Sequence, residues 1–181
     1  TYDLDTRMSR LLSRNTRYAA AALSPDGSKV ATIETGADYQ TNLVVLDYSV
    51  GDVVKKFENP ANHFISMPRW NEAGTEIIAL VTDRDGKKLS AFNYATGLIN
   101  TIKDFGEENI GYPVPYKNFV LYNSPISGID NIYALDRSTG IRYQVTSSRL
   151  GAYNPAVSSD GNTIYYNEQS RDGMNVVQMP F

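Results

Sequence analysis

Short apolar segments alternate with turn-forming residues along the whole chain. Three of these segments share a sequence pattern, in which an apolar run ends in Asp or Asn: 43–47 (LVVLD), 89–93 (LSAFN) and 132–136 (IYALD). Their last positions lie 46 and 43 residues apart, and 175–178 (NVVQ) is a weaker fourth copy. Short runs of apolar and β-branched residues that are bounded by turns indicate β-strands. The sequence therefore predicts a β unit that is repeated along the chain.

A tight turn recurs in phase with these segments. Its copies are 23–30 (LSPDGSKV), 70–77 (WNEAGTEI) and 157–164 (VSSDGNTI), with Gly27, Gly74 and Gly161 at the same place. Asp accepts local backbone hydrogen bonds in such a turn, and Gly adopts the positive φ that a tight hairpin needs. The copy at 115–118 (PYKN) has lost the glycine, and we expect Asn118 to take the left-handed conformation in its place.

The two elements define a unit of about 43 residues with four short strands, which is typical of a β-propeller blade. The expected strands are 18–23, 29–35, 43–48 and 53–58, then 66–70, 76–82, 88–94 and 98–103, then 111–114, 119–123, 131–136 and 141–146, and finally 154–157, 163–168 and 174–179. The predicted fold class is all-β, with about four blades of four antiparallel strands. The predicted blades are 16–60, 61–105, 106–148 and 149–181, of which the last lacks its outer strand, and 1–15 is expected to end a preceding blade.

The N-terminal region allows more than one interpretation. Segment 8–13 has the register of an outer strand, so it could complete the last blade and close a four-bladed ring. We favour an arc of a larger, six- to eight-bladed propeller, because 2–6 resembles the remnant of a truncated blade. Alanines at 19–22 favour a helix over 9–23 when taken alone. The repeat register overrides that helix, because 19–23 falls where innermost strands of the other copies fall.

The repeat resembles the TolB-type (PD40, WD40-like) propeller repeat. The residues that carry the resemblance are 24–28, 132–140 and 144–146, with 158–162 as a weaker copy. The second and third copies depart from the family, because their Pro-Asp-Gly core is lost. The resemblance implies a periplasmic or other extracytoplasmic location in the cell envelope and protein partners, including envelope or peptidoglycan-associated proteins. Rings of this type usually have six blades, which again implies an arc. Similar blades also form regulatory propellers of prolyl-oligopeptidase-like and tricorn-like peptidases.

Composition and charge narrow the range of partners. With 41% apolar and 20% charged residues, the chain has the composition of an ordinary soluble globular protein, and its thirteen tyrosines favour strands. The net charge of −3 argues against nucleic-acid binding, and the arginines at 7, 10, 14 and 17 are expected to be solvated. The lack of cysteine excludes disulfides, thiolate metal sites and a cysteine nucleophile. No apolar run approaches the ~20 residues that span a bilayer, so direct membrane insertion is not expected.

Catalytic chemistry finds little support in the sequence. His63 is the sole histidine, and no Gly-x-Ser-x-Gly motif is present, so we predict that the chain is not an enzyme and has no metal or cofactor. Segments 83–86 and 171–173 resemble fragments of calcium-binding loops, but neither continues to a Glu at the spacing of an EF-hand. They are expected to be hairpin turns. The adjacent Glu107 and Glu108 are expected to lie in a solvated loop.

Binding is expected on the face where loops from an outer strand to the next inner strand meet loops between second and third strands. The predicted partner-binding residues are Arg17, Tyr39, His63, Phe64, Tyr112, Arg149 and Tyr153. Tyr, Phe and Arg are enriched at recognition hot spots. Alternatively, the aromatic residues pack over blade junctions. The sequence favours a non-catalytic protein-binding or scaffolding propeller, with a regulatory propeller of a peptidase or a carbohydrate-binding propeller as alternatives.

Overall fold

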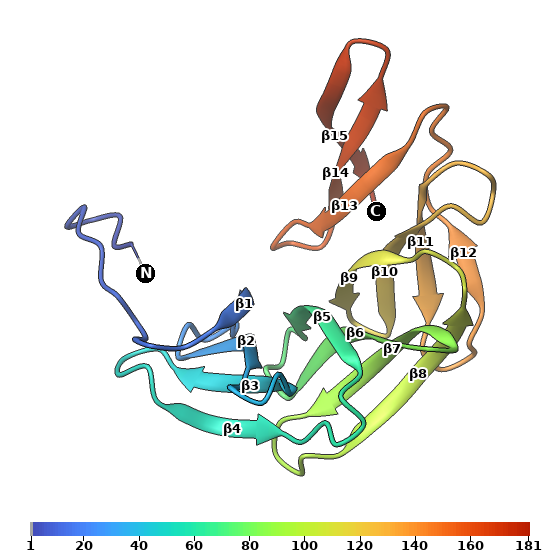
Figure 1. Cartoon of the computed structure of the whole chain (residues 1–181). Coiled ribbons are helices and arrows are strands. Elements are labelled where there is room, and N and C mark those ends of the chain that lie inside the picture. The colour runs from blue at the N-terminus through green and yellow to red at the C-terminus, as the bar shows by residue number, and fades with distance from the viewer. Residues whose placement is uncertain (1) are drawn as a thin grey trace.

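Four antiparallel sheets follow one another around an axis in the computed structural model, which describes residues 2–181 (Figure 1). Blade 1 holds β1 (Tyr18–Leu23), β2 (Lys29–Thr35), β3 (Thr41–Asp47) and β4 (Val53–Phe57), and blade 2 holds β5 (Phe64–Trp70), β6 (Glu76–Asp83), β7 (Gly86–Asn93) and β8 (Ile99–Gly106). Blade 3 holds β9 (Gly111–Tyr116), β10 (Phe119–Ser124), β11 (Asn131–Asp136) and β12 (Arg142–Gln144), and blade 4 holds β13 (Ala152–Val157), β14 (Thr163–Ser170) and β15 (Gly173–Pro180). The predicted all-β propeller fold is confirmed.

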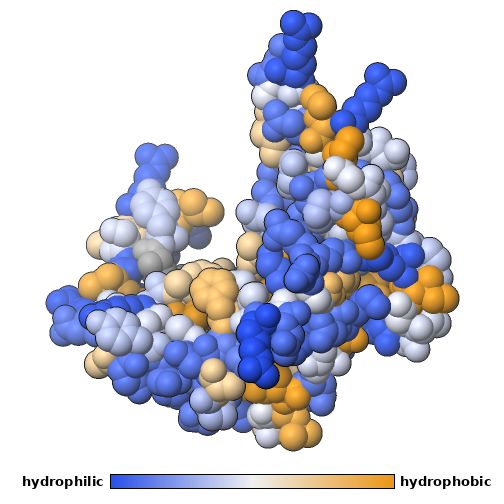
Figure 2. Space-filling model, turned by 45° about the vertical axis from the view of Figure 1, so that its right-hand side comes forward, coloured by the Kyte–Doolittle hydropathy of each residue, from blue (hydrophilic) through white to orange (hydrophobic). Residues whose placement is uncertain are grey.

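The four blades form an open arc. The inner strands β1, β5, β9 and β13 lie nearest the axis, and each blade continues outward in chain order (Figure 1). The space-filling view shows a wide hollow between the column that blade 4 forms and the N-terminal segment (Figure 2). Within residues 2–181, β15 pairs with β14 alone, so segment 8–13 does not complete blade 4. The molecule is a partial propeller, and ring closure through the N-terminal segment does not occur.

The hydrophobic core is divided among the spaces between blades. Successive side chains of a strand point to opposite faces of a sheet. In β6, Ile77 therefore packs in the core shared with blade 1, whereas Ile78 packs in the core shared with blade 3. A third cluster, which includes Leu121 and Ile164, joins blades 3 and 4. Blades 2 and 3 thus each bury both faces of their sheet against the neighbouring blades.

Aromatic pairs reinforce these junctions. Phe57 of blade 1 meets Phe92 of blade 2 edge to face, with ring centroids 5.4 Å apart. Phe105 of blade 2 meets Tyr122 of blade 3 at 5.1 Å in a similar geometry. Such edge-to-face pairs stabilise packing by about 0.5–1.5 kcal/mol beyond the burial of their area. The blades are therefore held in a fixed angular relation.

Every inner strand carries a β-bulge at the same place. The residues with positive φ at these bulges are Ala20 (59°), Met67 (53°), Tyr112 (52°) and Asn154 (54°). The pairing register shifts there in each blade. In blades 2 to 4 the next residue is a buried proline, Pro68, Pro113 or Pro155, and in blade 1 it is Ala21. Proline cannot donate to a strand ladder, so within sheets it is confined to edges and bulges.

The hairpin turns follow the predicted chemistry with one exception. Gly27 (φ 71°) and Gly161 (φ 74°) adopt the left-handed conformation that their turns require. In the short turn between β9 and β10, however, the residue with positive φ is Lys117 (φ 51°), so the prediction that Asn118 takes this role is wrong. Asn118 contributes through its side chain, whose amide donates to the Asp136 carboxylate at 2.6 Å.

The N-terminal segment confirms that 9–23 is not a helix, but it does not form the outer strand predicted at 8–13. None of the described residues forms a helix, and 8–13 is not a strand, because its one ladder contact is an isolated bridge between Tyr2 and Ser9. The segment instead lies against the turn after β3, where the Arg10 guanidinium donates to the Tyr48 carbonyl at 2.6 Å. Gly51 permits the close approach, since a Cβ there would lie 1.9 Å from the Leu12 carbonyl oxygen. Within 2–181, no helix is long and apolar enough to cross a membrane.

Candidate partner-binding face

The antiparallel order of the strands gives the arc two different faces. The loop face carries the connections between blades, 58–63, 107–110 and 145–151, together with the second-to-third strand connections 36–40, 84–85, 125–130 and 171–172. The turn face carries the first-to-second and third-to-fourth strand connections. The structure confirms that 84–85 and 171–172 are hairpin turns. The loop face is the one on which the sequence predicts binding.

Hydrogen bonds join two loops of this face at the junction of blades 1 and 2. The Asn62 side-chain oxygen accepts from the Thr41 N–H at 2.9 Å, and its amide nitrogen donates to the Tyr39 carbonyl at 3.2 Å. The Asn59 amide donates to the carbonyls of Thr41 (2.7 Å) and His63 (2.8 Å). Loops 36–40 and 58–63 are therefore held side by side.

Two large aromatic side chains remain exposed at this junction. Tyr39, at the tip of the β2–β3 connection, is 73% exposed, and Phe64, the first residue of β5, is 64% exposed. The Tyr39 backbone has a positive φ of 62°, which places its side chain at the end of a tight bend. The alternative that these aromatic residues pack over blade junctions does not hold for this pair, because both rings face solvent.

A polar cavity of about 530 Å³ lies beside this pair. It is lined by residues 61–63 and 82–85, so His63 forms part of its wall. The Asp83 carboxylate accepts a hydrogen bond from Lys88 Nζ at 2.7 Å and one from the Asp85 N–H at 2.8 Å. The bond from Lys88 is the main reason that the pKa of Asp83 lies below its usual range, and nearby His63 acts in the same direction. The cavity therefore presents a fixed carboxylate with an exposed arginine, Arg84, next to it.

Tyr112 lies in a different environment. It lies in the inner strand β9, at the bulge, and lines an axial pocket of about 260 Å³ with Ala20, Met67 and Pro113. The Tyr112 backbone N–H donates to the Met67 sulfur at 3.2 Å, and the Tyr112 side chain is 42% exposed. Tyr112 therefore faces the axis of the arc, whereas Tyr39 and Phe64 face the loops.

The remaining predicted residues lie at other places on the loop face. Arg17 is exposed just before β1, and its carbonyl accepts from the Thr35 N–H at 2.9 Å. Arg149 is exposed in the loop between blades 3 and 4, where Tyr153 is partly buried at the start of β13. The structure therefore brings Tyr39, His63 and Phe64 together at the junction of blades 1 and 2, while Arg149 and Tyr153 lie at the junction of blades 3 and 4.

The expectation of a solvated Glu107–Glu108 loop is half wrong. Glu107 is exposed, but Glu108 accepts from the Ser124 hydroxyl at 2.5 Å and from Arg142 Nη1 at 2.7 Å. The neighbouring Tyr122 ring is buried, and this burial raises the pKa of the Tyr122 hydroxyl to about 12. Glu108 ties the connection between blades 2 and 3 to β12. No sequence signal links Glu108 to Arg142, which lies 34 residues away.

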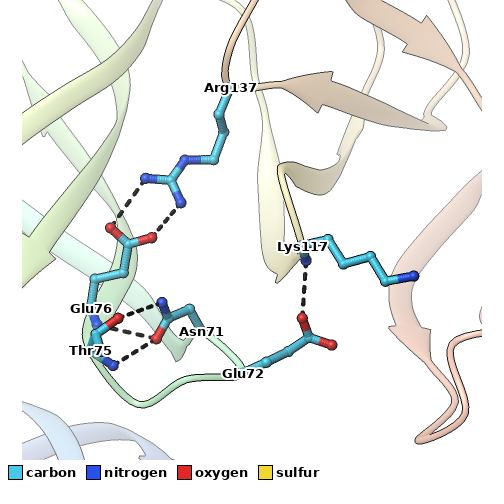
Figure 3. A network of polar contacts seen from close by, with 6 residues as sticks. All are labelled: Asn71, Glu72, Thr75, Glu76, Lys117 and Arg137. Carbon is cyan, nitrogen blue, oxygen red and sulfur yellow. Dashed lines mark hydrogen bonds and ion pairs between the residues drawn. The ribbon is translucent and has the colours of Figure 1, made fainter.

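The turn face has its own polar contacts between blades (Figure 3). Arg137 of blade 3 donates to both carboxylate oxygens of Glu76 in blade 2, and Glu72 accepts from the Lys117 N–H at 3.1 Å. Asn71 accepts from the Thr75 N–H at 2.9 Å and so closes the turn that positions Glu72. These groups satisfy one another across the junction of blades 2 and 3, so on the turn face polar contacts add to the hydrophobic packing between these two blades.

Comparison with known proteins supports the fold. Neither a family model nor a curated protein matches the sequence. Among solved structures, TolB from Acinetobacter baumannii superposes with a TM-score of 0.80 at 16% identity over 99% of this chain and 45% of its own. A putative TolB from Agrobacterium tumefaciens gives 0.77 at 17% identity, covering 99% and 64%. A puromycin-hydrolyzing peptidase from Mycobacterium tuberculosis gives 0.68 at 16% identity, covering 90% and 29%.

These likenesses extend over the chain but not over the other proteins. The chain spans less than two thirds of the length of each of the three structures. At 16–17% identity they show a shared β-propeller fold. Function does not follow from fold alone, because one fold carries many functions.

Proposed function

We infer that this chain is a non-catalytic, protein-binding or scaffolding part of a β-propeller in the bacterial cell envelope. The observation that carries the proposal is the junction of blades 1 and 2, where the exposed rings of Tyr39 and Phe64 stand beside a polar cavity. Interface hot spots combine rigid aromatic side chains with charged groups in this way. The proposed partner is a protein of the envelope, including the peptidoglycan-associated class.

Rigidity of the junction supports a protein partner. Asn59 and Asn62 hold the two loops by side-chain hydrogen bonds, so little conformational entropy remains to be lost when a partner docks. The cavity walls offer both signs of charge, from Asp83 and Arg84. We propose that a partner places a polar or charged side chain in the cavity and packs apolar surface on Tyr39 and Phe64.

The extracytoplasmic location is proposed on two grounds. The Ser-Pro-Asp-Gly turn at 24–27 and segment 132–140 resemble the TolB-type repeat, and two of the similar structures carry the name TolB. The likeness to a puromycin-hydrolyzing peptidase keeps a regulatory propeller as the second candidate. A carbohydrate-binding propeller would need stacking aromatic residues and paired carboxylates around the axis, and the axial pocket offers Tyr112 alone.

The test is capture of proteins from a bacterial envelope extract by the intact chain. We expect Tyr39→Ala and Phe64→Ala each to weaken capture of the same protein by about tenfold or more, because hot-spot aromatic residues contribute over 1 kcal/mol. Tyr2→Ala is the matched control, since Tyr2 is an exposed tyrosine outside the loop face, and it should leave capture unchanged.

Two results would overturn the proposal. If the Tyr39 and Phe64 variants both capture the protein as well as the unsubstituted chain does, the junction of blades 1 and 2 is not the binding site. Selective retention of the chain on polysaccharide, with no protein captured, would favour the carbohydrate-binding alternative. Circular dichroism of each variant establishes that the β-sheet content is unchanged.

A further inference from the structure

The polar cavity at the junction of blades 1 and 2 has one carboxylate in its wall that is already satisfied. Asp83 Oδ2 accepts from Lys88 Nζ at 2.7 Å, and Asp83 Oδ1 accepts from the Asp85 N–H at 2.8 Å. The positive charge of Lys88 offsets the negative charge of Asp83 at this distance. Asp83 therefore has little attraction left for a cation that enters the cavity.

Two other side chains of the cavity wall are available to a ligand. The Arg84 side chain is 93% exposed, and its Nε lies 3.7 Å from Asp85 Oδ1, a separation at which a surface ion pair is weak. The His63 imidazole forms no hydrogen bond within residues 2–181, where the bonds of His63 all involve its main chain. The Asn59 side chain holds that main chain at both the N–H (3.1 Å) and the carbonyl (2.8 Å). An imidazole on a fixed backbone and a guanidinium, both hydrogen-bond donors, thus remain.

The charge of the cavity becomes positive when His63 gains a proton. With a neutral imidazole, the charges of the wall offset one another in two pairs, Asp83 with Lys88 and Arg84 with Asp85. A protonated imidazole adds one positive charge to these two pairs. The other acidic groups on the adjoining loops and on β8 are exposed, so water and salt screen their charges. They are Asp38, Glu58 and Asp104. Protonation therefore gives the cavity an attraction for anions.

We propose that this cavity binds a carboxylate of the partner protein through Arg84 and His63, and that it binds the carboxylate more tightly when His63 is protonated. The inference rests on the proposed function, because the partner that packs on Tyr39 and Phe64 supplies the carboxylate. Guanidinium and imidazolium groups both donate charge-assisted hydrogen bonds to carboxylates, and such bonds are stronger than those between neutral groups. The partner is therefore a protein with an acidic side chain next to an apolar surface.

The composition of the chain makes the effect of pH specific. His63 is the sole histidine, and imidazole is the side chain that ordinarily gains its proton between about pH 8 and pH 5. Asp83 stays ionised over this range, because its hydrogen bond from Lys88 holds its pKa below the usual range. A change in carboxylate affinity between about pH 7.5 and pH 5.5 therefore reports the protonation of His63.

The experiment titrates the 181-residue chain with N-acetyl-glutamate amide, which carries one carboxylate and no other charge. The backbone amide signals of residues 61–63 and 84–85 are followed by nuclear magnetic resonance. We expect saturable shifts of these signals, with a dissociation constant about threefold or more lower at about pH 5.5 than at about pH 7.5. The neutral N-acetyl-glutamine amide and the cationic N-acetyl-lysine amide should leave the same signals unshifted.

Three variants assign the effect to particular side chains. Arg84→Gln should weaken binding of the glutamate compound by about threefold or more at both pH values, because it removes a positive charge. His63→Gln should retain the weaker binding and lose the dependence on pH. Arg171→Gln is the matched control, since 171–173 repeats the Arg-Asp-Gly sequence of 84–86 in the equivalent hairpin of blade 4, where Arg171 is also exposed. It should bind as the unsubstituted chain does.

Several results would overturn the carboxylate site. They are the absence of saturable shifts with the glutamate compound, equal shifts with the glutamine compound, tighter binding of the lysine compound, or a pH dependence that persists in His63→Gln. The proposed function is tested separately, by protein capture through Tyr39 and Phe64. If the glutamate compound fails to bind while capture still depends on these two rings, the carboxylate site is wrong and the proposed function stands. Binding of the compound without any such capture has the opposite meaning.

Discussion

Asp26 and Asp160 lie in equivalent hairpin turns, and each stabilises its turn by hydrogen bonds to its carboxylate. Asp26 accepts from the Ser24 hydroxyl at 2.5 Å and from the Ser28 hydroxyl at 2.7 Å, and Asp160 accepts from the Ser158 hydroxyl at 2.5 Å. These hydrogen bonds favour the ionised carboxylate, so the pKa of each aspartate lies below its usual range. The repeated turn therefore depends on charged aspartate as well as on glycine.

Acid should loosen these turns. A carboxylate whose pKa is lower in the folded than in the unfolded chain contributes stability that is complete above the unfolded value, about 4, and is lost as pH falls through the folded value. We expect the melting temperature to fall below about pH 4. The double variant Asp26→Asn/Asp160→Asn should show a shallower fall, measured by thermal unfolding across pH. An acid response as steep as that of the unsubstituted chain would contradict this role.

At the scale of single elements, the bulged inner strand explains why the axial edge of a blade does not pair with another strand. The bulge at Met67, Tyr112 and Asn154 turns the strand, and the proline after each removes one N–H donor. Blade 1 has Ala20 at its bulge with the same positive φ, but Ala21 follows in place of proline. The backbone of β1 therefore has the same bulge as the other inner strands, although position 21 is alanine instead of proline.

Ala21→Pro should stabilise the chain. The substitution restricts the unfolded chain at a position where the three equivalent residues are proline, and compatible changes of this kind contribute about 0.4–1 kcal/mol. Ala22→Pro is the control, because Ala22 is paired with Ala31 in the ladder and is buried, so proline there should destabilise. Urea unfolding of both variants gives the free energies. Destabilisation by Ala21→Pro would show that β1 is not equivalent to the other inner strands.

Strand positions could be predicted from sequence because each strand lies between recognisable turns. The strands β1, β2 and β11 begin and end where the repeat register places them. The strand predicted at 8–13 does not form, because apolar residues form a strand only where the edge of a sheet is available to pair with them. The bulges were missed, although the prolines at 68, 113 and 155 recur at blade spacing. At the loop face, hydrogen bonds from Asn59 and Asn62 join segments about twenty residues apart, which pattern alone does not reveal.

At the scale of the whole molecule, stability should vary along the arc. Blades 2 and 3 bury both faces against neighbours, while blade 4 packs on blade 3 alone within the described residues. In stacked repeats, stability is approximately a sum of the units and the interfaces between neighbours. The end blade therefore has fewer interfaces to hold it.

Hydrogen exchange should reveal this gradient of stability along the arc. We expect amides of β6 and β10 that pair within their sheets to exchange most slowly, and those of β13 and β14 to exchange faster, because local opening requires the loss of one interface instead of two. Equal protection of blades 2 and 4 would show that the arc unfolds as a single cooperative unit.

The bulge and proline of the inner strands also bear on how such a protein could have arisen. A unit that carries its own barrier to strand pairing can be copied within a gene without each new copy creating an aggregation-prone surface. Gene duplication could then add or remove units while the interior of each stays the same. The number of copies would set the width of the central opening, so this local defect in a ladder leaves evolution free to vary the size of the ring.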